Sequence, residues 1–224
     1  MNGKTNYFRP SSQVLGVKTR GARGELASNR YLGDTSLPDN SGHDVLPYEN
    51  VNLWIVNIPK EIDHHEFLGC IRNTGKVRSL VLHPPVGKHT NKAAALSFIR
   101  RDSAVKFLAD CRSGKINMRG MKLYATWNRN RVREPADDTV SRVLMIEGDA
   151  KLVNQKHLNE FFAEKVAYDI DEIIEHGRKE GSDAARCTIE YRFASWRGQA
   201  QLALMALRTE RQSLTVEYGK DPCE

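Results

Sequence analysis

Aromatic and basic side chains that could bind a nucleic acid lie in one part of the sequence. Trp54, Tyr124 and Trp127 occur in or next to stretches with strand-like composition. Every nucleobase has a flat face on which such a ring can stack, and stacking contributes about 1–3 kcal/mol per base. Basic residues in the same part of the chain could hold the phosphates between the bases: Arg78, Lys88, Lys92, Arg129, Arg131 and Arg133.

The net charge of +6 is unevenly distributed over the 224 residues. Residues 51–128 contain 13 Lys and Arg against 5 Asp and Glu, a balance of +8. Residues 141–224 contain 12 against 15, a balance of −3. Surplus positive charge on one domain is the electrostatic footprint of a protein that binds a polyanion. The basic charge therefore coincides with the aromatic candidates.

The stretch Val51–Ile58 must position Trp54. Its β-branched and aromatic residues predict a strand that ends at Pro59. Because side chains alternate across a strand, Leu53 and Ile55 should face a core, and Trp54 should lie on the opposite face.

This strand resembles the first-strand signature of the RNA-recognition motif (RRM) family, with Trp54 where the family carries a base-stacking ring. The family's second signature corresponds to Asn91–Phe98, and its two stacking positions are Ala93 and Ala95 here. The resemblance implies the RRM fold and contact with single-stranded RNA, with modest affinity and weak sequence discrimination because two rings are absent. We add Asn57, in the first signature, and His83, at the end of the next strand, to the RNA-binding candidates.

The following segments predict the order βαββαβ, which is the ferredoxin-like layout. We expect a helix capped by Asp63, strands over 76–83 and 92–99, a helix capped by Asp102 or Ser103, and a strand over 121–127. Residues 131–140 are polar and contain Pro135, which predicts a linker.

The same layout returns after the linker, so we predict an α+β chain with two tandem RRM-like domains, at residues 49–130 and 141–220. Residues 1–48 have no strand or helix period, which predicts a disordered tail. Its basic stretch Lys18–Gly24 could touch phosphates or be a solvated linker.

In the second domain we expect Asn154 to cap a helix. We also expect Leu144 at the position of Trp54. Alignment of Tyr191 with Phe98 puts Arg186 and Thr188 at the stacking positions.

Each candidate has a second interpretation. Trp54 could be covered by the tail, the linker or the other domain, and Tyr124 and Trp127 could serve packing. The basic residues could be ordinary solvated side chains, and His83 could be an ordinary surface histidine.

We find no catalytic signature, and we expect a protein that is not an enzyme and that needs no cofactor or metal. No apolar run is long enough to span a membrane, so we expect an intracellular protein. The resemblance favours the nucleus and RNA processing, with the cytoplasm as the alternative. Two hypotheses result: a single-stranded RNA-binding protein, with a protein partner on the second domain as an addition, or a scaffold whose RRM folds dock partner proteins.

Overall fold

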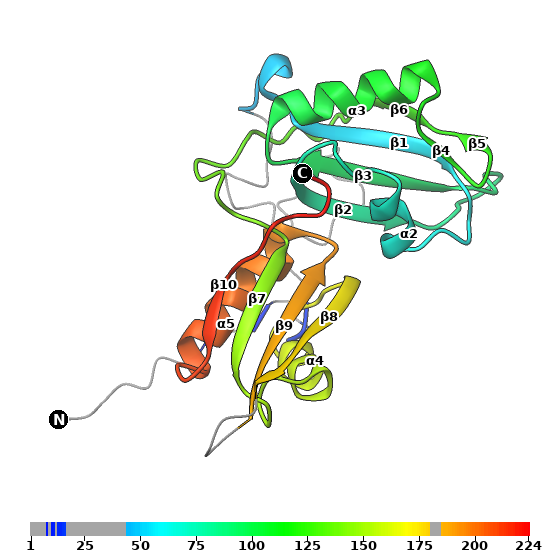
Figure 1. The fold of residues 1–224 in the computed structure, drawn as a ribbon. Coiled ribbons are helices and arrows are strands. Elements are labelled where there is room, and N and C mark those ends of the chain that lie inside the picture. Colours follow the sequence, from blue (N-terminus) through cyan, green and yellow to red (C-terminus); the bar gives the residue numbers. More distant parts are fainter. Residues whose placement is uncertain (1–7, 9, 12, 17–43, 180–184) are drawn as a thin grey trace. The chain divides into compact units, whose positions relative to one another are not determined.

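The computed structural model describes residues 8, 10, 11, 13–16, 44–179 and 185–224. The chain divides into two compact units (Figure 1). The first domain lies within Gly16–Asp138 and includes Pro222–Glu224; the second lies within Met1–Leu15 and Thr139–Asp221. Most of the tail predicted over residues 1–48, including Lys18–Gly24, lies outside the described residues.

The first domain follows the predicted order βαββαβ, with one added hairpin. Its elements are a 3₁₀ turn Pro47–Glu49, β1 Asn52–Ile58, α2 His64–Gly69, β2 Val77–His83, β3 Lys92–Phe98, α3 Arg101–Ser113, β4 Asn117–Met118, β5 Met121–Lys122 and β6 Tyr124–Trp127. The predicted last strand is thus divided, because β5 pairs with β4 and β6 pairs with β1. Arg119 and Gly120 connect the hairpin with φ of +49° and +79°, as a tight two-residue turn requires.

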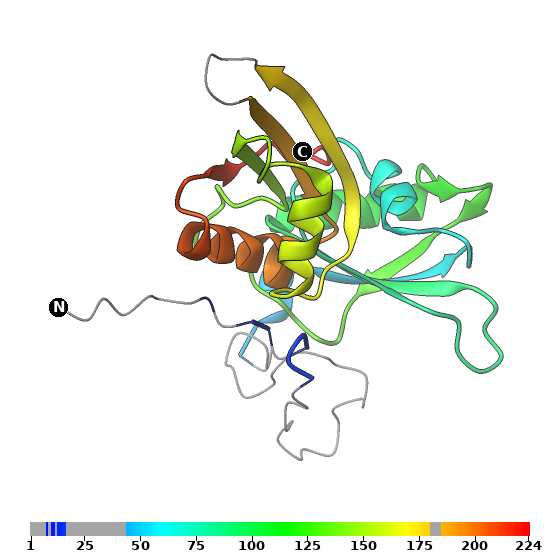
Figure 2. The same ribbon diagram turned by 90° about the horizontal axis from the view of Figure 1, so that it is seen from below.

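The sheet of the first domain has the antiparallel order β2-β3-β1-β6, the strand order of an RRM fold. Figure 2 shows α2 and α3 on one side of this sheet. Leu53 and Ile55 face the helices and are fully buried, as predicted, and the rings of Phe98 and Phe107 pack 5.8 Å apart between sheet and α3. Among the described residues of this domain, no α-helix lies on the other side of the sheet.

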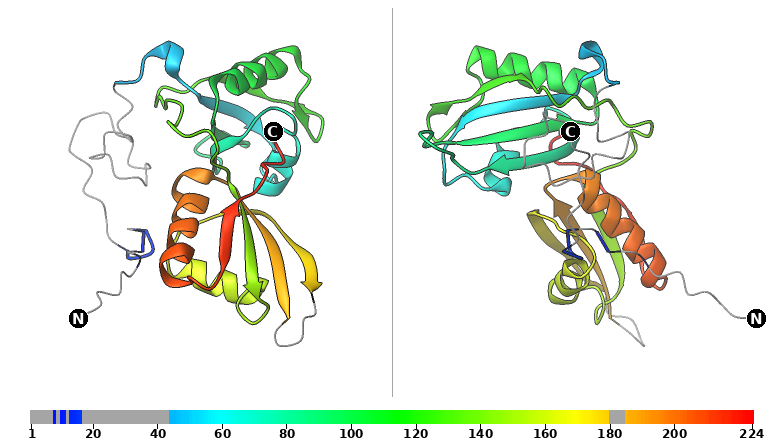
Figure 3. Two further views of the ribbon diagram at one scale, coloured as in Figure 1. Left: turned by 60° about the vertical axis from the view of Figure 1, so that its left-hand side comes forward. Right: turned by 180° about the vertical axis from the view of Figure 1, so that it is seen from behind.

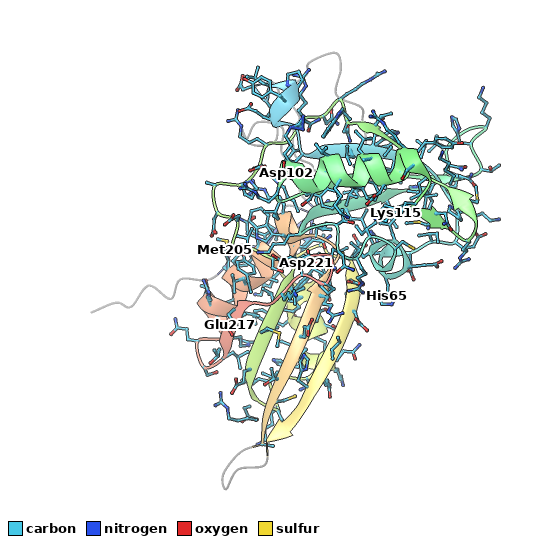
Figure 4. The ribbon with its side chains drawn as sticks, turned by 45° about the horizontal axis from the view of Figure 1, so that its top comes forward. His65, Asp102, Lys115, Met205, Glu217 and Asp221 are labelled. Carbon is cyan, nitrogen blue, oxygen red and sulfur yellow. The ribbon has the colours of Figure 1, made fainter. Side chains whose placement is uncertain are left out.

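One predicted helix cap is confirmed and the other is wrong. The Asp63 side chain accepts the N–H of Glu66 at 2.8 Å and caps α2. Helix α3, in contrast, begins one residue before Asp102, and its N-cap residue Arg100 makes no side-chain cap. Asp102 lies in the first turn (Figure 4). The cap comes from the segment after β6, where Glu134 Oε1 accepts the N–H of Arg101 at 2.7 Å.

The second domain repeats the layout, which confirms the predicted α+β fold with two ferredoxin-like domains. Its elements are β7 Val143–Asp149, α4 Gln155–Ala163, β8 Ile170–Lys179, β9 Arg186–Phe193, a π-type turn Trp196–Ala200, α5 Gln201–Glu210 and β10 Thr215–Tyr218. The strand order β10-β7-β9-β8 corresponds to that of the first domain. Asn154 caps α4, as predicted: its Oδ1 accepts the N–H of His157 at 2.9 Å.

Aromatic side chains make the core of the second domain. The Phe162 ring lies edge-on to the rings of Tyr168, Tyr191 and Phe193, with centroid distances of 6.1, 5.0 and 5.5 Å. Edge-to-face pairs of this kind add stability beyond the area they bury. Both helices lie on this side of the sheet (Figure 3).

The last residues of the chain complete the first domain. The Cys223 carbonyl accepts the N–H groups of Thr74 and Gly75 at 2.8 and 2.6 Å, and the Cys223 side chain is fully buried. These bonds fix the turn between α2 and β2, and Lys76 adds a contact to Glu224 at 3.9 Å.

Candidate nucleic-acid interface

The helix-free side of the first sheet, here called the open face, gathers the best candidates. Trp54 pairs with Ala95 on one side and with Thr126 on the other, and Val56 pairs with Tyr124. The alternation of side chains therefore puts the following residues on this face: Asn52, Trp54, Val56, Ser79, Val81, His83, Ala93, Ala95, Ser97, Tyr124 and Thr126.

Two rings converge over the alanines of β3. Trp54 is on β1 and His83 is on β2, which are the two neighbours of β3 and so lie roughly 9–10 Å apart. Their ring centroids are only 5.2 Å apart, with 43° between the ring planes. Both side chains must therefore lean over β3, where Ala93 and Ala95 leave the room. The rings that the RRM family carries on its third strand are replaced here by a pair of rings carried by the two neighbouring strands.

The open face is apolar and accessible around this pair. Val56, Val81 and Tyr124 are 39%, 48% and 56% exposed. Lys122 Nζ lies 5.9 Å from the centroid of the Tyr124 ring, which places a cation beside an exposed stacking surface. Sequence reasoning missed Lys122, although the strand predicted over 121–127 places it two residues before Tyr124 and therefore on the same face.

Trp127 lies on the opposite side of the sheet. It pairs with Leu53, whose side chain is in the core, and the guanidinium carbon of Arg101 lies 4.6 Å from the Trp127 ring centroid. Of its two interpretations, this placement favours packing, because strand alternation separates Trp127 from the face that carries Tyr124.

Asn57 and Lys92 are engaged at the end of β1. Asn57 has a φ of +70° at a break in the β1–β3 register. Its amide donates to the Lys122 carbonyl at 2.8 Å, and its Oδ1 accepts from Asn91 at 2.7 Å. Lys92 Nζ donates to the Ile62 carbonyl at 2.6 Å. Both side chains donate to backbone carbonyls of their own domain. Either donor would have to leave its carbonyl before it could bind RNA.

The arginines after β6 bind the first domain. Arg131 donates to the Val45 carbonyl at 2.9 Å, Arg133 donates to that of Asp44 at 3.1 Å, and Arg78 donates to that of Arg133. The predicted linker, residues 131–140, therefore begins as an ordered part of this domain. Of the basic candidates, Lys88 in the β2–β3 loop and Arg129 and Arg133 after β6 are exposed.

The segment after β6 also closes one end of the open face. Asn52, which precedes Trp54 on this face, donates to the Asn130 carbonyl at 2.8 Å and accepts the N–H of Asn128 at its own carbonyl. Ser97 at the same end is only 1% exposed. The accessible part of the face therefore extends from Trp54 toward Tyr124 and His83.

The corresponding face of the second domain has a different chemistry, and the sequence alignment of its strands was wrong. Leu144 pairs with Tyr191 and lies in the core. It therefore corresponds to Leu53, which pairs with Leu96 and lies in the core of the first domain. Met145 therefore occupies the position of Trp54. By the same register, Thr188 and Glu190 stand where the first domain has Ala93 and Ala95.

Charged side chains cover this second face. Arg192 bonds Glu172 and also Glu190, the latter at 2.6 Å, and His176 Nε2 lies 2.9 Å from Glu190 Oε2. Burial works to raise the pKa of Glu190, but the hydrogen bonds from Arg192 and His176 outweigh it and lower the pKa. The Glu190 carboxylate is therefore held ionised at a position where a base would have to stack.

Other chemistries find little support in the described part of the chain. No group of three His, Cys, Asp or Glu side chains there is placed to hold a metal ion. Burial raises the pKa of the Cys111 thiol to about 12, which disfavours the nucleophilic thiolate. Among the helices of the described residues, none is long and apolar enough to cross a membrane.

No protein-family model and no curated protein matches the sequence. Among solved structures, RNA recognition domains 1 and 2 of Sex-lethal from Drosophila melanogaster align over 76% of this chain and 100% of that chain, at 17% identity and a TM-score of 0.30. The first two RRM domains of the yeast poly(U)-binding protein Pub1 align over 75% and 99%, at 14% identity and a TM-score of 0.31. We base the fold assignment on the strand order and register within each domain.

Proposed function

We propose that this chain of two RRM-fold domains binds single-stranded RNA through the open face of its first domain. The observation that carries the proposal is the convergence of Trp54 and His83 over Ala93 and Ala95. Two rings held over a flat sheet offer a stacking surface to an unpaired base, which a base inside a duplex could not reach. Tyr124, with Lys122 beside it, offers a second stacking surface on the same face.

Phosphate contacts would come from the exposed cations around this face. Lys88, Lys122 and Arg129 are exposed, and the domain carries the basic charge of the chain. About three phosphate contacts predict a slope of roughly −2 in a plot of log affinity against log salt, because single strands release about 0.7 counterion per contact. Few specific donors face the bases, so discrimination between sequences should be weak.

The RRM resemblance also leads us to propose a role in post-transcriptional RNA processing or regulation in the nucleus.

Fluorescence anisotropy with short labelled single-stranded RNA pools tests the RNA proposal at two salt concentrations. Trp54→Ala should weaken binding by about 1–3 kcal/mol, since it removes one stacking ring. Met145→Ala is the matched control, because Met145 has the same register position in the second domain and should leave the affinity unchanged. Equal effects of the two substitutions, or no RNA binding by the unmodified chain, would refute the proposal.

A second candidate function is favoured by the face of the second domain. Its Glu172–Arg192–Glu190 ion pairs fill the stacking positions with charge, and this surface suits a protein partner better than an RNA base. We propose that the second domain docks a protein while the first binds RNA. Capture of a protein by the unmodified chain but not by Arg192→Ala would support this second function.

A further inference from the structure

The described residues near the N-terminus lie on the helix side of the second domain. The Phe8 side chain packs against its hydrophobic core. The Phe8 N–H donates to Glu210 Oε1 at 3.1 Å, and the Ser11 N–H donates to the Lys165 carbonyl at 2.9 Å. The Leu15 N–H donates to the Ser11 carbonyl at 3.1 Å, which closes a turn. The two views of Figure 3 agree that this segment lies on the side of α4 and α5, away from the sheet's open face.

The second domain builds this site from its own residues. Glu210, the last residue of α5, binds Lys165, which follows α4, at 2.8 Å through Oε2, and both side chains are largely buried. The other oxygen, Oε1, is the one that receives the Phe8 N–H. Lys165 and Arg211 also lie over the Phe161 ring, at 5.7 and 4.8 Å from its centroid. A largely buried carboxylate that an ion pair holds by one oxygen offers its other oxygen as a fixed acceptor for a backbone N–H.

The N-terminal segment is not one of the six elements of the fold. Four strands and two helices of the second domain come from residues 143–218, and Phe8 reaches them from the other end of the sequence. A short segment with one aromatic anchor and two backbone donors is chemically a peptide ligand. We propose that the α4–α5 side of the second domain is a peptide-binding site, and that the segment of this chain anchored by Phe8 and Ser11 is its intramolecular occupant.

This inference goes beyond RNA binding and does not depend on it. Because the occupant is covalently attached, an added peptide has to compete with a ligand at high effective concentration. An added copy should therefore bind poorly to the unmodified chain and well to a chain whose own segment has lost its anchor.

The test uses the full-length chain and an acetylated, fluorescent peptide of residues 8–16. The peptide should bind the Phe8→Ala chain at least about tenfold more tightly than the unmodified chain, because the intramolecular competitor is removed. A peptide carrying Phe8→Ala should not bind. Equal binding to both chains, or absent binding to a folded Phe8→Ala chain, would overturn the proposal.

Two further variants separate a ligand from a structural part of the domain. Ser11→Pro removes the donor to Lys165 without touching the core, and it should also open the site to the added peptide. Glu210→Gln in the Phe8→Ala chain should weaken capture of the peptide, because the charged acceptor is lost. Hydrogen exchange should show α4 and α5 still protected in Phe8→Ala; global exchange of both helices would make the segment anchored by Phe8 and Ser11 part of the fold and refute the inference.

Discussion

The rings of Trp54 and His83 are 5.2 Å apart although an entire strand separates the residues that carry them. The alanines of β3 make this approach sterically feasible, because a larger side chain at Ala93 or Ala95 would fill the same space. In the sequence, Ala93 and Ala95 indicate the loss of two stacking rings. In the structure, rings from the two neighbouring strands lie over these alanines.

The first prediction concerns cooperation between these two rings. If they act as one surface, His83→Ala and Trp54→Ala should each weaken RNA binding, and the double variant should lose less than the sum. Aromatic pairs couple by about 0.5–1.5 kcal/mol in such cycles, so we expect a coupling energy in that range. Anisotropy titrations of the four chains measure it. Additive losses would mean that the rings contact RNA independently.

The second prediction concerns the N-terminal end of α3. Glu134→Ala should destabilise the first domain by about 1 kcal/mol, because the Arg101 N–H loses its acceptor. Arg100→Ala is the control, since it removes the 3.2 Å ion pair with Glu134 and leaves the cap in place. Urea unfolding measures the stability, and hydrogen exchange in α3 localises the loss. If Arg100→Ala costs as much as Glu134→Ala, the ion pair rather than the cap is responsible.

The sequence predicted the features that depend on residues close to one another in the chain. Strand alternation predicted the burial of Leu53 and the open-face position of Trp54, and local composition found the caps at Asp63 and Asn154. Such features depend on neighbours in the sequence. The cap on α3 comes from Glu134, 33 residues away, so no local pattern could reveal it.

Register explains the other failures. In the second domain, Tyr191 and Phe193 are both aromatic and both buried, so composition alone could not decide which of them corresponds to Phe98. The pairing of Leu144 with Tyr191 shows that Phe193 corresponds to Phe98. The stacking positions on β9 therefore move by two residues, and the position of Trp54 on β7 moves by one, from Leu144 to Met145. The meeting of Trp54 and His83 also escaped prediction, because it depends on two strands that are not adjacent.

The third prediction concerns a buried charge in the second domain. Arg142 is fully buried and binds Asp171 at 2.7 Å, Asp221 at 3.0 Å and the Phe193 carbonyl at 2.9 Å. Figure 4 labels Asp221, which follows β10. Arg142→Met should destabilise this domain by about 3–5 kcal/mol, because two buried carboxylates lose their partner.

Arg186→Met is the matched control for Arg142→Met. Arg186 binds Glu147 at 3.1 Å, but both side chains are about half exposed, so its loss should cost at most about 1 kcal/mol. Hydrogen exchange in β7 and β9 measures both variants. Similar losses for the two would show that the buried network contributes no more than a surface ion pair.

The fourth prediction is a pH dependence in the first domain. The hydrogen bonds from Arg119, at 2.8 and 2.6 Å, lower the pKa of Glu66. A lowered folded-state pKa stabilises the fold above the unfolded-state value of about 4.3, and this stabilisation is lost as the pH falls through the folded-state pKa. Glu66→Gln should therefore melt at a lower temperature than the unmodified chain at pH 7, and the gap should close in acid. A gap that is constant with pH would rule out the carboxylate as its source.

The fifth prediction concerns the turn between α2 and β2, where Gly75 has a φ of +144°. A Cβ atom at Gly75 would lie 1.9 Å from Ser103 Oγ and 2.5 Å from Ser103 Cβ, so Gly75→Ala must displace α3. Gly87→Ala isolates the backbone strain, because Gly87 has a φ of +62° and no atom within 4 Å of the added Cβ. We expect Gly75→Ala to destabilise the first domain by about 1–3 kcal/mol more than Gly87→Ala, the range for overpacking.

A second substitution decides whether the contact with Ser103 causes that loss. Ser103→Gly removes the two atoms that a Cβ at Gly75 would meet within 3 Å and leaves Ser103 Cα at 3.7 Å, an ordinary contact distance. A glycine in the first turn of α3 has its own cost of up to about 1 kcal/mol. If overpacking causes the loss, Gly75→Ala should cost less in the Ser103→Gly chain than in the unmodified chain. Equal costs in the two backgrounds, measured by urea unfolding, would instead attribute the loss to backbone strain at Gly75, where the N–H also donates to Cys223.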